Sequence, residues 1–157
     1  AKYKGKITED RKRIEKEMLC YSDYKENIVR AKEDKNFLDN MDYRDFEKII
    51  YEYLRAQDLE IVVQKIKKDK GYDFYIPTLN CVVDVKKYSS SGKISLSIIR
   101  TFIGVMIENN VDKGIIISST EFTQSALNFV QNLEQEIVLL SLQDLLELDG
   151  IFASVFK

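Results

Sequence analysis

Two strand-like runs between Gly71 and Tyr88 carry ionisable side chains at positions that a strand would bury. The first run, residues 72–77, has Asp73 at its second position, and the second run, residues 82–88, holds Asp84 and Lys86 among valines. Burying a carboxylate or an ammonium without a partner costs several kcal/mol, so these charges need compensation. A divalent cation supplies it. Two carboxylates beside a lysine are the arrangement expected of a metal-dependent phosphodiesterase site.

The turn between the two runs predicts that the aspartates meet. Residues 77–80 (Pro-Thr-Leu-Asn) are short enough to close a hairpin. If the turn is centred near Leu79, Asp73 and Asp84 lie six and five residues from it and stand almost opposite each other. Lys86 follows Asp84 by two residues and therefore shares its face of the sheet.

The residue types also predict the metal and its chemistry. Carboxylate oxygens without imidazole or thiolate ligands select Mg²⁺ or Mn²⁺ over zinc. The predicted reaction is in-line hydrolysis of a phosphodiester by a metal-bound water. Lys86 would orient or deprotonate that water, or else stabilise the transition-state charge, and the sequence leaves these roles open.

Composition excludes several other chemistries. The chain has 157 residues, two cysteines and no histidine, which rules out Ser-His-Asp and Cys-His catalysis and His-ligated zinc unless a partner supplies the imidazole. Two cysteines, Cys20 and Cys81, are too few for a disulfide framework, and both are expected to be buried apolar residues. With 45% hydrophobic and 32% charged residues, the chain is expected to fold as one globular domain.

The sequence also carries expectations about location and completeness. No apolar run approaches the ~20 residues needed to span a bilayer, and no leader resembles a secretory signal. We therefore expect a cytoplasmic protein without membrane contact. The chain opens with Ala1, which suggests either a fragment or removal of an initiating methionine.

Positive charge gathers around the predicted site although the net charge of the chain is −2. Residues 62–93 contain seven lysines against three aspartates, which could attract phosphate locally. A solvated, lysine-protected strand edge is the simpler alternative. The loop Ser91-Gly92-Lys93 is expected to face the substrate. The candidate nucleic-acid contacts among these lysines are Lys67, Lys68, Lys70, Lys87 and Lys93.

The elements needed to hold the site follow from hydrophobic periodicity. Asp42 is the expected N-cap of a helix over residues 43–56, with Glu47 beside its apolar stripe. Strands over 59–63, 72–77 and 81–88 form a meander, and Ser118 or Thr120 is expected to cap a helix over 121–132. The remaining predictions are one or two helices over 8–38 capped by Thr8, a helix over 94–106, strands over 114–117 and 137–140, a helix over 142–148 capped by Ser141, and a short helix or tail over 149–157.

This order of elements predicts an α/β fold, with a mixed sheet of about five strands and helices on both faces. The helical residues 8–38 carry no chemistry of their own. They would pack on the core, serve as a dimerisation helix, or link to an upstream domain, and packing is the commonest of these roles.

Residues 41–148 resemble the PD-(D/E)xK, or restriction-endonuclease-like, superfamily, and within it the Mrr-type nucleases. The resemblance implies an N-terminal helical extension over residues 1–40, a nuclease domain over 41–148 with a three-layer core, and a C-terminal tail over 149–157. It departs from the family pattern at Tyr72, where the superfamily name has proline, and at Asp84, which replaces a longer glutamate or glutamine. The segments that carry it are residues 41–54 with Phe46-Glu47, 69–73 (Asp-Lys-Gly-Tyr-Asp), 83–88 (Val-Asp-Val-Lys-Lys-Tyr), 113–118, 122–126 and 137–140 leading to Leu145.

Site roles are implied by the same resemblance. Asp73 and Asp84 would bind the metal, with Glu47 contributing directly or through water and Val85 through its backbone carbonyl. Lys86 would be catalytic together with these three carboxylates. Thr123, near a helix start, would contact DNA phosphate, although capping the helix explains it equally well.

The function so implied is a Mg²⁺-dependent or Mn²⁺-dependent endonuclease that cleaves DNA, as part of a restriction, defence or mobile-element system. RNA is not excluded as a substrate. A homodimer is expected because double-strand cleavage by one small site calls for two copies, and an effector or recognition domain would lie outside this chain. The alternatives are a nucleic-acid-binding module that keeps the fold without cleaving, and a nuclease that resolves Holliday junctions.

Overall fold

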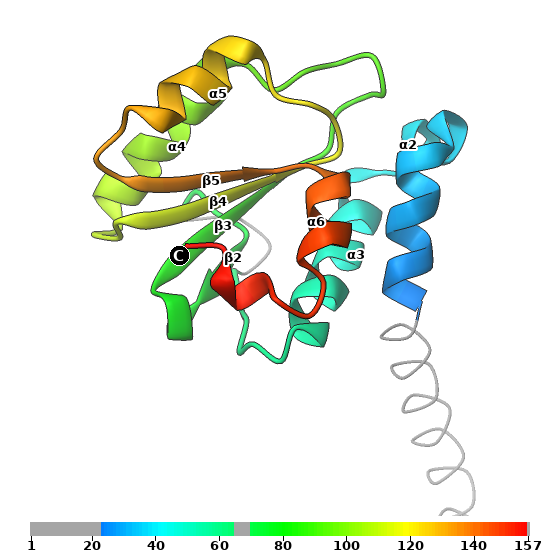
Figure 1. Cartoon of the computed structure of the whole chain (residues 1–157), viewed down its shortest axis with the longest axis horizontal. Coiled ribbons are helices and arrows are strands. Elements are labelled where there is room, and N and C mark those ends of the chain that lie inside the picture. Colours follow the sequence, from blue (N-terminus) through cyan, green and yellow to red (C-terminus); the bar gives the residue numbers. More distant parts are fainter. Residues whose placement is uncertain (1–22, 65–69, 157) are drawn as a thin grey trace, which may run out of the picture.

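The computed structural model describes residues 23–64 and 70–156, which form a five-stranded sheet with helices on both faces (Figure 1). The strands lie in the order β1-β2-β3-β4-β5. This is the mixed α/β sheet that the sequence predicts. The strands are β1 (Val62–Val63), β2 (Phe74–Ile76), β3 (Cys81–Lys86), β4 (Lys113–Ser118) and β5 (Glu136–Leu140), and the α-helices are α2 (Lys35–Asn40), α3 (Tyr43–Ala56), α4 (Leu96–Glu108), α5 (Gln124–Gln131) and α6 (Leu142–Leu148).

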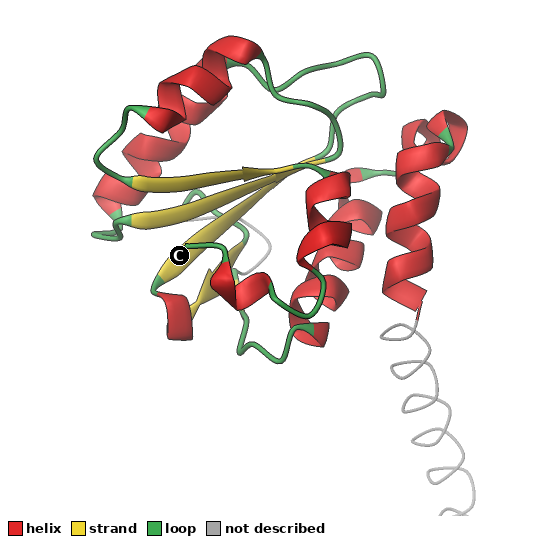
Figure 2. Cartoon of the chain, viewed as in Figure 1, coloured by secondary structure: helices red, strands yellow, loops and turns green. Residues whose placement is uncertain are grey.

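The sheet has an antiparallel half and a parallel half. Strands β1, β2 and β3 form the predicted antiparallel meander, while β3, β4 and β5 are parallel. Helices α4 and α5 make the crossovers that parallel strands require, and both cover the same face of the sheet (Figure 2). Strand β3 therefore joins the two halves and carries Asp84 and Lys86 in its second half.

The hairpin between β2 and β3 fixes the register on which the site depends. A single 3₁₀ turn over Pro77–Leu79 closes it, and Asn80 follows with a φ of 48°, in the left-handed region that asparagine tolerates. Phe74 pairs with Val83 and Ile76 pairs with Cys81. Extending this register by one residue places Asp73 opposite Asp84, as the turn length predicts.

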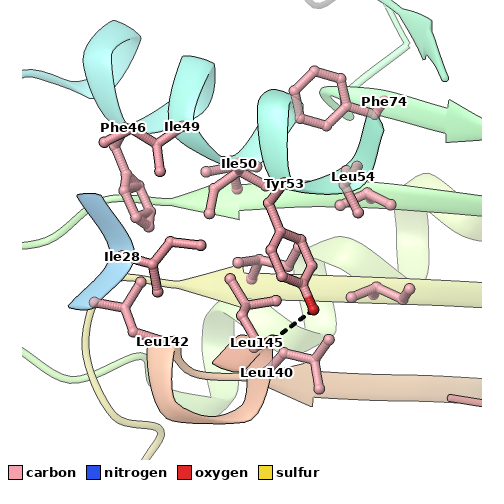
Figure 3. Close-up of a cluster of buried hydrophobic side chains, with 14 of the residues drawn as sticks. Ile28, Phe46, Ile49, Ile50, Tyr53, Leu54, Phe74, Leu140, Leu142 and Leu145 are labelled. Atoms are coloured by element: carbon pink, nitrogen blue, oxygen red, sulfur yellow. Dashed lines mark hydrogen bonds between the residues drawn. The ribbon is translucent and has the colours of Figure 1, made fainter. Parts of the chain in front are cut away.

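Two apolar cores sandwich the sheet because successive strand residues point to opposite faces. On one face, Val83 and Val85 of β3 pack with α3 and α6, and the Tyr53 hydroxyl donates a 2.6 Å hydrogen bond to the backbone carbonyl of Leu145 (Figure 3). On the other face, Val82 packs with residues of α4 and α5. Both cores hold β3 rigidly in the centre.

The described part of the N-terminal extension packs against the core of the sheet. Residues 23–33 are helical, and Ile28 on this helix is fully buried in the core on the α3 side. Tyr24 donates a 2.8 Å hydrogen bond to Asp149, and Lys25 forms a 2.6 Å ion pair with the same carboxylate. These contacts tie the helix to the end of the chain. The predicted cap Thr8 and the helical positions up to residue 22 lie outside the described residues.

Helix ends agree with the predicted caps at two positions and differ at a third. Asp42 caps α3, and Ser141 caps α6 in a reciprocal capping box with Asp144. Helix α5 is capped by Thr123 instead of Ser118 or Thr120, so the prediction of its start was wrong. The hydroxyl of Ser118 accepts a hydrogen bond from the Thr120 amide, which closes a turn before the helix.

The first strand of the meander also differs from expectation. Strand β1 spans only residues 62–63 of the predicted 59–63, and Val63 is 48% exposed. At the end of the chain, where a short helix or tail was expected, residues 152–154 form a 3₁₀ helix in which Phe152 is buried. Among the helices of the described ranges, none is both long and apolar enough to cross a bilayer.

Candidate active site

Asp73 is buried at the entrance to β2, with 2% of its surface exposed. Gly71 turns the chain into this position with a φ of +81°, in the left-handed region that favours glycine. The Asp73 carboxylate then accepts a 2.7 Å hydrogen bond from the Val85 amide through Oδ2, and Oδ1 accepts a hydrogen bond from the Tyr43 hydroxyl. Donors from a strand and a helix therefore fix this carboxylate.

Asp84 and Lys86 lie on the neighbouring strand and form an ion pair. The Lys86 ammonium is 3.0 Å from Asp84 Oδ2. Asp84 is 4% exposed, whereas the side chain of Lys86 is 28% exposed. The Asp84 carboxylate is thus buried beside Asp73, whereas the Lys86 side chain reaches solvent, where it is accessible to a substrate.

Tyr43 is a site residue that sequence reasoning missed. It is the first residue of α3, directly after the N-cap Asp42, and its hydroxyl is the donor to Asp73. Burial and this hydrogen bond raise the pKa of the Tyr43 hydroxyl, and the charges of Asp73, Glu47 and Asp84 raise it further. The hydroxyl consequently remains a donor. In the sequence, only its place at a helix start hinted at this role.

Glu47 follows Tyr43 by one helical turn, so both side chains lie on the same face of α3. Its charge acts on the Tyr43 hydroxyl, which places it on the same side of the site as the two aspartates. Within the described ranges, however, no three Cys, Asp or Glu side chains converge closely enough to hold a metal ion by themselves. Glu47 is therefore placed beside the aspartate pair without completing a three-carboxylate cluster.

The oxygen ligands that the two aspartates offer can be compared with the preferences of divalent cations. Asp73 and Asp84 offer buried carboxylate oxygens, and the chain contains no imidazole. Hard oxygen donors of this kind fit Mg²⁺ or Mn²⁺, which keep several water ligands and need few protein ligands. The aspartate pair therefore fits such a cation better than zinc.

The other predicted site residues differ in their burial and in their contacts. Val85 is fully buried, and its backbone amide donates to the Asp73 carboxylate, a contact that the sequence did not predict. Lys70 and Lys93 are exposed and Lys87 is half-buried, while the Thr123 hydroxyl accepts a 3.2 Å hydrogen bond from the Ala126 amide and so acts as a helix cap. Lys67 and Lys68 lie outside the described residues.

Comparisons with known proteins relate this geometry to a family. Residues 38–148 match the family model Mrr_cat, described as restriction endonuclease. Among solved structures, the chain is similar to the "DNA modification-dependent restriction endonuclease AspBHI", with a TM-score of 0.49 and 14% sequence identity. That alignment covers 87% of this chain and 40% of the other, so this chain spans less than half of that protein's length. No curated protein sequence gives a significant match.

Proposed function

Because the chain belongs to the restriction endonuclease family Mrr_cat, we propose that it is an endonuclease that hydrolyses phosphodiester bonds of DNA with Mg²⁺ or Mn²⁺ as cofactor. The observation that carries this proposal is the pairing of two buried aspartates with Lys86 on adjacent strands. A restriction, defence or mobile-element system is the proposed setting, with a homodimer as the cleaving unit.

The chain's own residues have separable roles in the proposed reaction. Asp73 and Asp84 would hold the divalent cation, with Glu47 acting through water and the Val85 carbonyl as a further oxygen donor. When bound, the cation supplies charge stabilisation for the phosphoryl group and acidifies a water. Tyr43 and the Val85 amide keep the Asp73 carboxylate in one orientation, which is the supporting role that ligands need from their neighbours.

Lys86 is the residue best placed to contact the substrate. Its side chain extends from the buried Asp84 to the surface, so its ammonium can donate hydrogen bonds to a phosphate oxygen or to an attacking water. Removing the ammonium should therefore slow cleavage while leaving the two aspartates in place. This separates its role from that of the metal ligands.

Nicking of supercoiled plasmid DNA tests the proposal. The protein and its Asp84→Ala variant are incubated with Mg²⁺, Mn²⁺ or EDTA. Asp112→Asn serves as a control because this exposed aspartate precedes the amino end of β4, whereas Asp84 lies toward the carboxyl end of the neighbouring parallel strand. We expect metal-dependent nicking by the wild-type protein and the control only. Equal nicking by Asp84→Ala would refute the enzymatic role, and binding without cleavage would favour a non-cleaving module.

The same assay resolves the substrate. Linear duplex, single-stranded DNA, RNA and a four-way junction are offered at equal nucleotide concentration. Preferential cleavage of duplex DNA supports the proposed substrate class. Preferential cleavage of the junction would instead assign the protein to junction resolution, for which the same residues would serve.

A further inference from the structure

We infer that a cleft at the end of the parallel strands holds a backbone phosphate of the nucleic acid, and that the N-terminal extension forms one of its walls. This inference rests on the proposed function. The cleft has a volume of about 310 Å³. One wall comes from residues 31–38, at the end of the helix over 23–33 and the start of α2, and the other comes from the segments that follow β3, β4 and β5. Its lining includes Lys32, Lys35, Ser91, Lys93, Thr120 and Gln143.

The position of the cleft suits a ligand of the active site. All three segments of the second wall leave the carboxyl ends of parallel strands, where open α/β sheets bind their ligands. The Ser119 amide donates a 2.9 Å hydrogen bond to the Lys86 carbonyl, and the Tyr88 amide donates a 2.8 Å hydrogen bond to the Ser119 hydroxyl. The cleft wall is thus joined directly to the backbone that carries Lys86.

Two hydrogen bonds between Asp39 and Ser90, called the clamp below, connect the two walls of the cleft. Asp39 on α2 accepts two 2.7 Å hydrogen bonds from Ser90, one from its amide and one from its hydroxyl. The Ser90 hydroxyl and amide hold the pKa of Asp39 below its usual range, and the charges of Lys87 and Lys35 contribute to this shift. The carboxylate therefore stays ionised at neutral pH. It ties the serine-rich loop to the N-terminal extension, 51 residues away in the sequence.

The charge of the lining favours an anion. Three lysines line the cleft against one glutamate, Glu121. Lys32, Lys35 and Lys93 are exposed, and none of them forms an ion pair with any other residue that the structure describes. On a chain of net charge −2, this is a local concentration of positive charge, which the Asp39 carboxylate near Lys35 offsets only in part. Phosphate groups are attracted to such sites.

The chemistry of the lining favours the nucleic-acid backbone over a base. The described lining residues are lysines, hydroxyl-bearing residues, small residues, leucines, a glutamine and a glutamate, with no aromatic ring on which a base could stack. Lysines and hydroxyls contact phosphate oxygens without reading sequence. The cleft should therefore add salt-dependent affinity that is the same for every sequence.

Fluorescence anisotropy with a labelled DNA duplex tests this inference over a series of salt concentrations in EDTA, where cleavage does not interfere. The double variant Lys32→Ala/Lys35→Ala is compared with Arg55→Ala/Lys113→Ala, which removes the same charge at the end of α3 and at the start of β4. We expect the Kd of the first variant to rise roughly tenfold and its salt dependence to become shallower by about 2 in log–log slope. The control should lose much less affinity.

Replacing Asp39 tests the clamp separately, because the effects of charge and of loop release on DNA binding have opposite signs. Asp39→Ala removes a negative charge, so charge alone would tighten DNA binding, whereas release of the Ser90 loop should weaken it. We expect weaker binding. Equal affinities and salt slopes for the lysine variant and its control, or tighter binding by Asp39→Ala, would overturn the inference. Because binding is measured without metal, a result against phosphate binding in the cleft is distinguishable from a result against the proposed cleavage activity.

Discussion

Replacing Lys86 with methionine should destabilise the metal-free protein. The substitution keeps much of the side-chain volume but leaves the carboxylate of Asp84, whose side chain is 5% exposed, without the ammonium that lies 3.0 Å away. Asp73, across the hairpin, adds a second buried negative charge. Removing one partner of a buried ion pair costs about 3–5 kcal/mol. Because the Lys86 side chain is 28% exposed, solvent screens the pair, and we expect a loss of about 2 kcal/mol.

Urea unfolding at pH 8 in EDTA measures this loss. With a denaturant dependence of about 1–3 kcal/mol per M, the midpoint should fall by roughly 1 M. Lys48→Met, at an exposed position of α3, is the matched control and should change the free energy of unfolding by no more than about 0.5 kcal/mol. The double variant Lys86→Met/Asp84→Asn removes both charges and should be more stable than Lys86→Met alone.

Two results would refute this reasoning. Lys86→Met could prove as stable as the wild-type protein, or the double variant could prove less stable than the single one. Either would show that Lys86 does not compensate a buried charge. Calorimetric titration adds an independent check, since Lys86→Met removes a charge that repels cations and should bind Mn²⁺ at least as tightly as the wild-type protein while cleaving more slowly.

Three further variants extend the account. Tyr43→Phe removes the hydroxyl donor to Asp73, so half-maximal nicking should need roughly tenfold more Mg²⁺, and an unchanged Mg²⁺ requirement would contradict the positioning role. Gly114→Ala would place a Cβ 2.5 Å from the ring of Phe102 on α4, which should destabilise the fold by about 1–3 kcal/mol and lower the melting temperature. An unchanged melting temperature would show that α4 shifts to accommodate the methyl group. Burial raises the pKa of Tyr53 above 10.0, so its contribution to stability is complete below about pH 10 and falls above it by about 1.4 kcal/mol per pH unit. Tyr53→Phe should flatten this fall in urea unfolding, and an equally steep fall in the variant would show that other groups cause it.

The parts of the site that the sequence predicted are those set by local rules. Asp42 and Ser141 cap their helices because a side-chain oxygen before an apolar-periodic run satisfies the first free amides. The opposition of Asp73 and Asp84 followed from turn length and strand alternation, since a short hairpin leaves one register that buries the apolar face. Mixed sheet topology followed from the order of elements alone.

The parts that escaped prediction depend on contacts between distant segments. Tyr43 reaches Asp73 across 30 residues, and Asp39 reaches Ser90 across 51. Neither pair has a spacing that a local pattern could reveal. The cap of α5 was misplaced because Ser118, Thr120 and Thr123 are all good N-cap residues, and tertiary pairing decides among them, since the Thr123 amide bonds to the carbonyl of Ile94.

The position of a bound cation tests the central claim most directly. Crystals soaked in Mn²⁺ and measured at a wavelength where manganese scatters anomalously would locate the ion. The account predicts a peak in contact with the carboxylates of Asp73 and Asp84, and its loss in Asp84→Ala crystals. A manganese peak elsewhere, with the contacts of these two carboxylates to Tyr43, Val85 and Lys86 unchanged, would contradict it.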